Sequence, residues 1–387
     1  MELRMIVPRE GCGSSPERGD EVPSASFLQS RQWGEFKSAF GWKPLRFALE
    51  SEGRRLGLSL LVRSLPFGFS FSYLPHGPEL EPSVEDRAAF LARLSEELRP
   101  FLPKRCLFIR FDPPWYEAES QEAAAQTPPP AQPDAPQRAR VPREIRRPII
   151  GKPLRRAAYD VQPPDTVLVD LRPTEADILG AMKPKWRYNI RLAEKKGVCV
   201  EAGGAEAIPV FYELYRETSA RDRIAIHPET YYRQLFELSA EEFGGAGSKP
   251  FDLRLWVARR EGKALASIIT LFYGEQGTYL YGASSDEGRN FMPAYALQWA
   301  AMKAAKAAGC ERYDLFGIPP DDDPEHPMAG LYRFKTGFGG EIAHRAGSWD
   351  YPLIRPAYAC FKAAEAARAW WYKDFRKRFG RAGRKAS

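Results

Sequence analysis

The chain has 387 residues, of which 44% are hydrophobic and 13% aromatic, enough for roughly two domains with packed cores. It has no run of 18 apolar residues and no amino-terminal signal pattern, which argues against a membrane-spanning or secreted protein. The five cysteines are scattered and the four histidines unpaired, so we expect a cytoplasmic protein without a disulfide framework or a metal site.

The net charge of +7 is concentrated in two segments. Residues 373–385 contribute +6 and residues 138–156 contribute +7, which leaves the rest of the chain at −6. Basic segments of this kind attract nucleic acid or an anionic membrane surface, or they simply keep a protein in solution.

The first half is predicted to fold as strand, strand, helix and strand. Residues 56–80 read as apolar strands broken by turn residues, residues 85–102 have helical spacing, and residues 105–115 read as a buried strand. Residues 117–156 are rich in Ala, Pro, Gln and Arg, which predicts an irregular, disordered insertion between two folded parts.

The second half repeats a similar order, which indicates weak internal duplication. Its predicted elements, in chain order, are a strand at 166–171, a helix from the N-cap Thr174, a basic segment at 183–197, helices at 211–222 and 229–243, three strands within 251–284, a helix at 293–309 and a strand at 310–318. The predicted fold class is α/β (α+β), with mainly antiparallel sheets flanked by helices. This plan resembles acyltransferase domains of the GNAT type.

The segment RNFMPA, residues 289–294, bears on the acyl donor. GNAT domains have a glycine-rich loop at the matching place, and its backbone N–H groups bind the pyrophosphate of acetyl-CoA. Here Met292 replaces the first glycine, and Pro293 has no N–H to donate. We therefore expect a donor other than CoA and no cofactor.

Five segments, in order, resemble the FemABX family of peptidoglycan aminoacyltransferases: FLQSRQWGEFKSAFGWKP, QPPDTVLVDL, MKPKWRYNIRLAEKKGV, YLYGASSDEGRNFMPAYALQWAAMKAAKAAGCERYDLFGI and GLYRFKTGFGGE. The resemblance implies two GNAT-like domains, residues 1–164 with 347–387 and residues 165–346. It implies a monomeric enzyme that moves an amino acid from aminoacyl-tRNA to the stem-peptide amine of lipid II or UDP-MurNAc-pentapeptide. The span 205–248 is too short for the coiled-coil arm of some members, so we expect an armless member. The amino acid, the number added and the acceptor form stay open.

Lys335 and Asp112 are the candidate catalytic residues, and Tyr281 is a candidate for substrate binding. An aminoacyl ester is already activated, so the enzyme must place an amine against it and stabilise the oxyanion. The resemblance implies that Lys335 favours this charge; the alternative is a solvated lysine at a strand end. Asp112 matches a candidate base, although substrate-assisted proton transfer or a turn-capping carboxylate are alternatives. Tyr281 matches a tyrosine near the acceptor peptide, or is an ordinary strand aromatic.

The acceptor's pyrophosphate calls for basic groups. Lys37 matches a family lysine that contacts it, and Lys37 follows Trp33 by four residues, which places both on one helix face. A second contact comes from an arginine, for which Arg221 is our first choice and Arg223 and Arg233 are alternatives.

The basic segment 183–197 is the third candidate binding surface. Arg187 and Arg191 are four apart and are predicted to share a helix face, where they can meet tRNA phosphates or an acceptor phosphate. The alternative is a solvated face with Tyr188 and Leu192 packed inward.

Residues 352–381 are predicted to form an amphipathic helix with Trp370 and Trp371 beside the cationic run. This helix either rests on an anionic membrane surface as a peripheral contact or packs on the first domain. Two other functions remain open: a tRNA-dependent transferase that acts on a protein N-terminus or a lipid, and a non-enzymatic RNA-binding protein.

Overall fold

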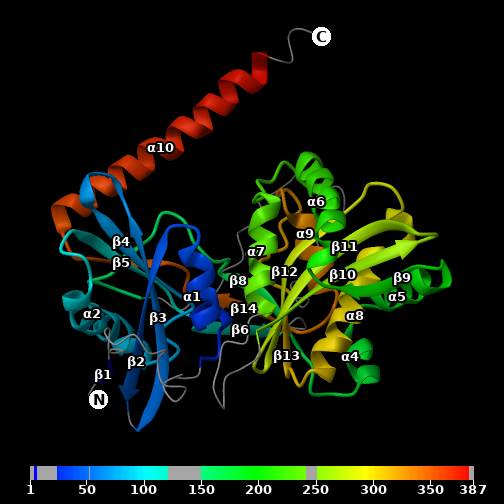
Figure 1. The fold of residues 1–387 in the computed structure, drawn as a ribbon, viewed down its shortest axis with the longest axis horizontal. Helices are drawn as coiled ribbons and strands as arrows, with labels where there is room; N and C mark the ends of the chain where they lie inside the picture. The colour runs from blue at the N-terminus through cyan, green and yellow to red at the C-terminus, as the bar shows by residue number, and fades with distance from the viewer. Residues whose placement is uncertain (1–3, 7–23, 52, 121–149, 241–250, 383–387) are drawn as a thin grey trace, which may run out of the picture.

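A computed structural model describes residues 4–6, 24–51, 53–120, 150–240 and 251–382. These residues form two mixed sheets with helices packed against them (Figure 1). The strands are β1 (Arg4–Ile6), β2 (Trp42–Ser51), β3 (Arg54–Ser64), β4 (Ser70–Pro75), β5 (Cys106–Asp112), β6 (Tyr116–Ser120), β7 (Arg155–Arg156), β8 (Asp165–Asp170), β9 (Cys199–Gly203), β10 (Phe251–Arg260), β11 (Lys263–Tyr273), β12 (Gln276–Ser284), β13 (Arg312–Asp314), β14 (Glu341–Arg345) and β15 (Trp349–Pro352). The α-helices are α1 (Arg31–Ser38), α2 (Arg87–Leu98), α4 (Glu175–Ala181), α5 (Pro184–Lys195), α6 (Ile208–Asp222), α7 (Glu229–Ala240), α8 (Pro293–Ala307), α9 (Ala329–Thr336) and α10 (Arg355–Ala382).

The two sheets share one topological plan. The first has the strand order β1-β2-β3-β4-β5-β15-β7, and the second has the order β6-β14-β8-β13-β12-β11-β10-β9. In each sheet an antiparallel run ends in a parallel pair, β4 with β5 and β12 with β13. A helix connects each parallel pair, α2 in the first case and α8 in the second. This repeat confirms the predicted fold class of mainly antiparallel sheets flanked by helices.

Two predicted helix ends are confirmed. Thr174 caps α4, because its side chain accepts a hydrogen bond from the N–H of Asp177. Gly309 follows the end of α8 with φ 87°, a conformation that glycine adopts without steric cost.

The predicted insertion at 117–156 is too wide at both ends. Residues Tyr116–Ser120 form β6 and pair with β14, so the start of this span belongs to the second sheet. At its other end, Ile150 and Leu154 are buried in the first core, and β7 pairs with β15. Residues 121–149 lie outside the described ranges.

The two halves of the chain share a hydrophobic core. Helix α1 packs on α7, and the ring centroids of Phe36 and Tyr231 are 4.8 Å apart. Phe27 and Trp33 belong to the same buried cluster, whose other members come from α6, α7 and β10–β12. Helix α1 therefore connects the first half to the second.

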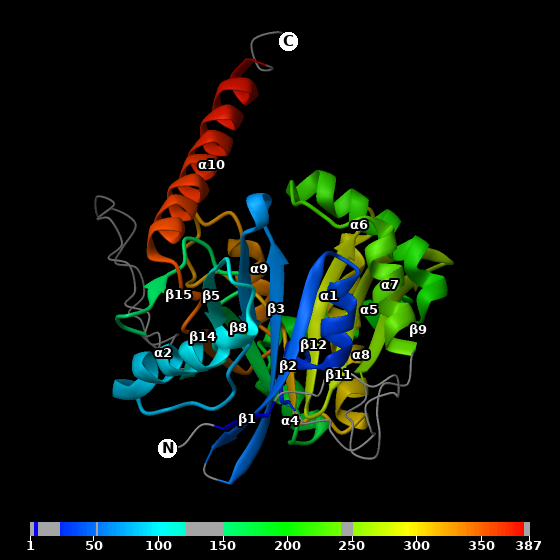
Figure 2. The ribbon, with the colours of Figure 1, turned by 60° about the vertical axis from the view of Figure 1, so that its left-hand side comes forward.

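The first turns of helix α10 pack on the first sheet, and the rest of the helix projects away from it. Tyr358 and Phe361 lie against Phe108 of β5, with ring centroids 5.3 and 5.0 Å away. Beyond these turns the helix extends away from the body, as two views show (Figures 1 and 2). In the described residues no helix is long and apolar enough to cross a membrane.

Candidate functional site

Lys335 is buried in the last turn of α9. Its side chain is 5% exposed, and its Nζ donates hydrogen bonds to the backbone carbonyls of Phe316 and Gly317, at 3.2 and 2.9 Å. The alternative of a solvated lysine on a strand end is therefore wrong, because the segment is helical and the amine points inward.

The surroundings of Lys335 tune its charge. Burial lowers the pKa of Lys335 to about 7, and nearby Asp314 opposes this shift. Asp314 accepts hydrogen bonds from the Thr166 hydroxyl and from the N–H of Phe316, and Arg345 lies 3.2 Å from its other oxygen. These hydrogen bonds hold the turn at residues 314–317, in which Phe316 has φ 59°. They therefore fix the carbonyls of Phe316 and Gly317, which accept hydrogen bonds from the Lys335 amine.

Strand β12 carries a tyrosine on each face at this point. The Lys335 Nζ lies 5.2 Å from the ring centroid of Tyr279. Against β11, Thr270 pairs with Tyr279 and Ile269 with Tyr281, so Leu280 is the extra residue of a bulge. In a regular strand residues 279 and 281 would share a face. The bulge instead packs Tyr279 into the cluster beside Lys335 and Tyr281 into the cluster shared with α1.

Tyr281 belongs to a group of tyrosines between α6, α7 and β12. Its ring centroid is 5.2 Å from Tyr232 and 6.5 Å from Tyr215. Burial raises the pKa of the Tyr281 hydroxyl well above its usual value. Tyr231 stacks into the same group and extends it to α1.

Lys37 lies at the α1 end of this tyrosine group. Its Nζ is 5.3 Å from the ring centroid of Trp33, which confirms that the two share a helix face, and 5.8 Å from Tyr231. Burial and the charge of Arg63 lower the pKa of Lys37. The ring of His227 stacks on Tyr231 at 4.0 Å, and burial and the charge of Lys37 lower the pKa of His227. Lys37 and Arg63 are two cations whose charges repel each other, and this makes the site suited to binding an anion.

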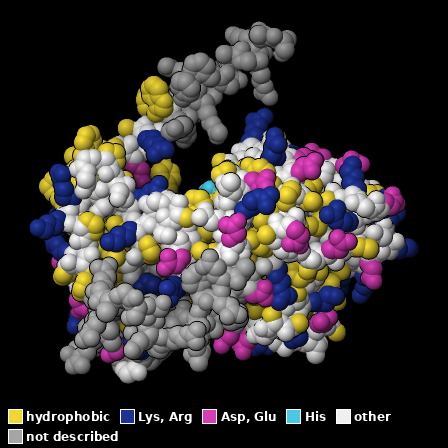
Figure 3. Space-filling model, viewed as in Figure 1, with side chains coloured by type: hydrophobic (Ala, Val, Ile, Leu, Met, Phe, Trp, Pro, Cys, Tyr) yellow, Lys and Arg dark blue, Asp and Glu magenta, His cyan; other side chains and the backbone are white. Residues whose placement is uncertain are grey.

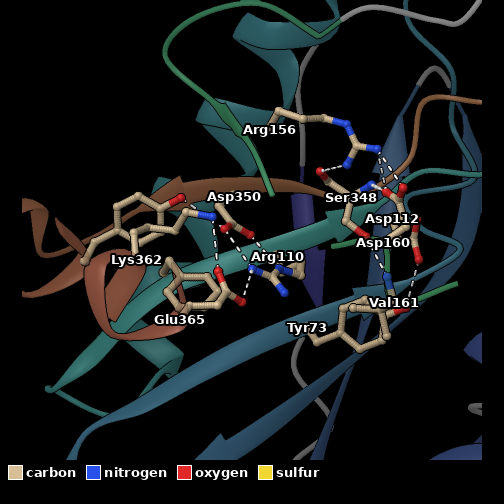
Figure 4. Close-up of polar contacts among 12 residues, drawn as sticks. Tyr73, Arg110, Asp112, Arg156, Asp160, Val161, Ser348, Asp350, Lys362 and Glu365 are labelled. Carbon is tan, nitrogen blue, oxygen red and sulfur yellow. Dashed lines mark hydrogen bonds and ion pairs between the residues drawn. The ribbon is translucent and has the colours of Figure 1, made fainter. Parts of the chain in front are cut away.

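Asp112 ends strand β5, and its contacts are internal (Figure 4). One carboxylate oxygen, Oδ2, accepts from the Tyr73 hydroxyl at 2.9 Å and from the backbone N–H of Gln162 at 3.0 Å. Burial, aided by the charge of Asp160, raises the pKa of Asp112 to about 7, while Arg345 opposes the shift. Since Arg345 also contacts Asp314, it joins the surroundings of Asp112 to the Lys335 turn.

Arg221, in the last turn of α6, is held by several polar contacts. It donates to the carbonyl of Ser284 at 2.8 Å and forms ion pairs with Asp222 and Asp286, at 2.9 and 3.2 Å. Arg233, one of the alternatives, pairs with Glu229. The structure thus places Arg221 as a support for the end of β12, with its charge matched by two carboxylates.

Arg187 and Arg191 lie four residues apart in α5, but their side chains have different surroundings. Arg187 donates to the carbonyls of Gly180 and Met182 at the end of α4, whereas Arg191 is exposed. The alternative was a solvated face with Tyr188 and Leu192 packed inward, and its placement of Tyr188 is wrong, since this ring is 61% exposed.

Helix α5 is joined to the Lys335 segment by one side chain. Trp186 donates from Nε1 to the carbonyl of Phe334 at 2.8 Å, and its ring covers Gly337. The N–H of Lys183 donates to the carbonyl of Gly337 at 2.9 Å. The start of α5 is therefore fixed to the end of α9.

Sequence reasoning missed Arg63, Tyr231, His227 and Tyr279. Arg63 lies on β3, which pairs with β2 and contacts α1, and Tyr231 and His227 lie in or just before α7, which packs on α1. Those contacts depend on tertiary structure. The sequence did draw attention to Tyr279, because it lies two residues before Tyr281 in the same predicted strand. The bulge that turns the two side chains to opposite faces could not be predicted from the sequence. In the described ranges, no three His, Cys, Asp or Glu side chains converge as metal ligands.

The model of the FemAB family matches residues 19–243 and 257–366 of the chain. The lipid II:glycine glycyltransferase of Staphylococcus saprophyticus is 24% identical over 87% of this chain and 90% of its own length. The protein of the same name from Staphylococcus epidermidis is 23% identical over the same shares. The crystal structure of FemX superposes with a TM-score of 0.67 at 20% identity, covering 88% of this chain and 96% of that one. With this coverage by the family model, the chain belongs to the FemAB family of aminoacyltransferases.

Proposed function

We propose that this protein transfers an amino acid from aminoacyl-tRNA to the stem-peptide amine of a peptidoglycan precursor, either lipid II or UDP-MurNAc-pentapeptide. The names of its glycyltransferase relatives support a lipid II-type acceptor. The observation that carries the proposal is that the amine of Lys335 is buried and hydrogen-bonded to a fixed backbone turn.

The reaction needs one new C–N bond and loss of one ester C–O bond. The acceptor amine attacks the ester carbonyl, and the carbonyl oxygen becomes an oxyanion. When the intermediate collapses, the ribose oxygen of the tRNA leaves and takes up the proton that the amine gives up. A protonated Lys335 has three N–H donors, of which two are used by the carbonyls of Phe316 and Gly317. The third can donate to the oxyanion and so stabilise the transition state.

The acceptor's pyrophosphate fits the site between α1 and α7. Lys37 on α1 and Arg63 on strand β3 supply two cations, and their mutual repulsion would be relieved by a bound anion. Strand β12 connects this site to the reacting centre, since Tyr281 lies in the tyrosine group beside Lys37 and Tyr279 faces Lys335.

Two features favour a tRNA-linked donor over CoA. Met292, with φ 58°, gives its N–H to the carbonyl of Arg289, and Pro293 begins α8, so this helix start does not offer the N–H groups of a pyrophosphate loop. In addition, α5 exposes Lys185, Tyr188 and Arg191, a basic and aromatic surface of the kind that binds an RNA backbone. Because α5 is fixed to α9, RNA bound there would be held in register with Lys335.

The test is transfer from a mixture of radiolabelled aminoacyl-tRNAs to lipid II and, separately, to UDP-MurNAc-pentapeptide. We expect label in one acceptor and a loss of at least 100-fold in kcat for Lys335→Met, which keeps the chain length but removes the donor.

Lys306→Met is the matched control. Lys306 also donates from Nζ to backbone carbonyls, those of Leu171 and Pro173 at 2.6 and 2.7 Å, but it is on the far end of α8. It should keep the activity of the wild type. An absence of label in both acceptors, with folded protein, would contradict the proposal.

A further inference from the structure

The base of α10 is held rigidly on the first sheet. Arg110 forms two hydrogen bonds with Asp350 of β15, at 2.7 and 3.0 Å, and the Tyr358 hydroxyl donates to the same carboxylate at 3.0 Å. Glu365, further along the helix, lies 3.9 Å from Arg110 (Figure 4). The direction in which α10 leaves the body is therefore set by buried contacts.

Beyond its base, α10 combines large aromatic residues with positive charge. Trp370 and Trp371 are 64% and 59% exposed. In the sequence, apolar residues continue at Phe375 and Phe379, four apart, and the stretch 373–385 has a net charge of +6. In Figure 3 a hydrophobic patch is visible on the described part of this arm.

A second aromatic residue lies at the same end of the first sheet. Phe67, in the turn between β3 and β4, is 87% exposed and has φ 60°. The residues that flank the turn, Leu65 and Phe69, pack in the cluster that also holds Phe361 of α10. The exposed ring of Phe67 and the start of α10 therefore rest on one cluster.

Basic residues accompany this turn as well. Arg105 donates to the carbonyl of Phe67 at 2.9 Å and lies 4.3 Å from the ring centroid of Phe69. Lys104 is exposed beside it. The turn thus has an exposed aromatic ring next to cations, the residue types that the sequence also combines at Trp370, Trp371 and residues 373–385.

We propose that α10 and the Phe67 turn form a docking surface for an anionic lipid bilayer. Aromatic side chains prefer the boundary between headgroups and acyl chains, and Lys and Arg are attracted to anionic headgroups. A helix that projects from a fixed base can lie on such a surface while the body stays in water. Docking on a bilayer goes beyond the proposed function. The suggested purpose of docking, which is to bring the enzyme to a lipid-linked acceptor, rests on the proposed function.

The experiment is flotation of the full chain with vesicles of phosphatidylcholine containing about 30% phosphatidylglycerol, and with pure phosphatidylcholine. We expect binding to the anionic vesicles, at least tenfold weaker binding to the neutral ones, and a decrease with added salt. The double variant Trp370→Ala, Trp371→Ala and the variant Phe67→Gly should each lower binding at least threefold. Glycine suits position 67 because of its positive φ.

Val84→Ala is the control, since Val84 is 60% exposed in the turn before α2 and takes no part in this surface. It should bind vesicles as the wild type does. Transfer to the water-soluble UDP-linked acceptor, without vesicles, should be unchanged in all of these variants, so a failure of the docking proposal is distinguishable from a failure of the proposed function. Equal binding by wild type and the double variant would overturn the inference. So would binding of tRNA, but not of vesicles, through Trp370 and Trp371.

Discussion

Asp112 and Lys335 are two buried ionisable groups whose pKa values burial brings to about 7 from opposite sides. In each case the charged form is disfavoured in a region that excludes water. For Asp112 the folded protein holds its proton up to a higher pH than the unfolded chain does. The contribution of Asp112 to stability therefore falls as pH rises between about 4 and 7, by up to about 1.4 kcal/mol per pH unit.

Asp112→Asn separates a catalytic role from a structural one. Both hydrogen bonds reach a single oxygen, so an asparagine carbonyl can accept them both. We expect the variant to keep its transfer rate within about tenfold and to lose the decline of wild-type stability between about pH 4 and 7. Urea unfolding across this pH range and steady-state transfer assays are the measurements. A loss of 100-fold or more in kcat, with the variant folded, would instead identify Asp112 as the base.

The sequence located Lys335 through its family resemblance but did not predict its environment. The run of Phe334 and the following glycines resembled a strand end, whereas the segment forms a helix that ends at Thr336. The carbonyls that hold the amine belong to residues 316 and 317, almost twenty positions earlier. No local pattern encodes that contact, because the 314–317 turn is fixed by Thr166 and Arg345 from other strands.

The contact between α5 and α9 depends on a glycine. A β-carbon at Gly337 would lie 2.0 Å from a ring atom of Trp186, although φ at this position is an ordinary −78°. Space, not backbone conformation, therefore requires glycine here.

Gly337→Ala should displace Trp186 and with it the end of α9. We expect a loss of about 1–3 kcal/mol of stability from overpacking and a fall in kcat of at least tenfold, because Lys335 is two residues away. Thermal unfolding and transfer assays measure the two effects.

Gly330→Ala is the control in the same helix. A β-carbon added at position 330 would have no neighbouring atom within 4 Å, so alanine there should be neutral or stabilise by up to about 1 kcal/mol. If Gly337→Ala behaves like Gly330→Ala in both assays, the contact does not position Lys335.

At the scale of elements, long periodic segments were predictable and short or crossing ones were not. The meander of β10–β12 and helix α8 follow from alternation, turn glycines and helical spacing. Strand β6 was hidden in a span whose overall composition suggested disorder, and it is ordered by pairing with β14, more than two hundred residues later. The bulge at Leu280 escaped prediction for a similar reason, since it appears only in the register with β11.

The whole molecule is held together by a core that belongs to both halves. Trp33 and Phe36 of α1 are buried among residues of α6, α7 and β10–β12. Neither half can keep this surface covered if the other unfolds.

We therefore expect one cooperative unfolding transition, with equal calorimetric and van't Hoff enthalpies, although the chain has two sheets. Phe36→Ala should lower the stability of the whole protein by about 3–5 kcal/mol, because a fully buried phenylalanine is lost. Differential scanning calorimetry is the measurement. Two separate peaks, of which Phe36→Ala moves one, would show that the halves unfold independently.

The chain passes between the two sheets after β5, β6, β7 and β14. The passage after β6 includes residues 121–149, which lie outside the described ranges, and the other three passages are joined to one another by hydrogen bonds. The N–H of Ala346 donates to the carbonyl of Trp115, that of Ser348 to Asp160, and that of Gln162 to Asp112. A single connecting segment would let the two sheets rotate about it. Three connecting segments that are hydrogen-bonded to one another resist both rotation and separation of the two sheets. The spacing between the two sheets is thus set when the protein folds, so the proposed transferase would select an acceptor by shape with little cost in ordering at each turnover.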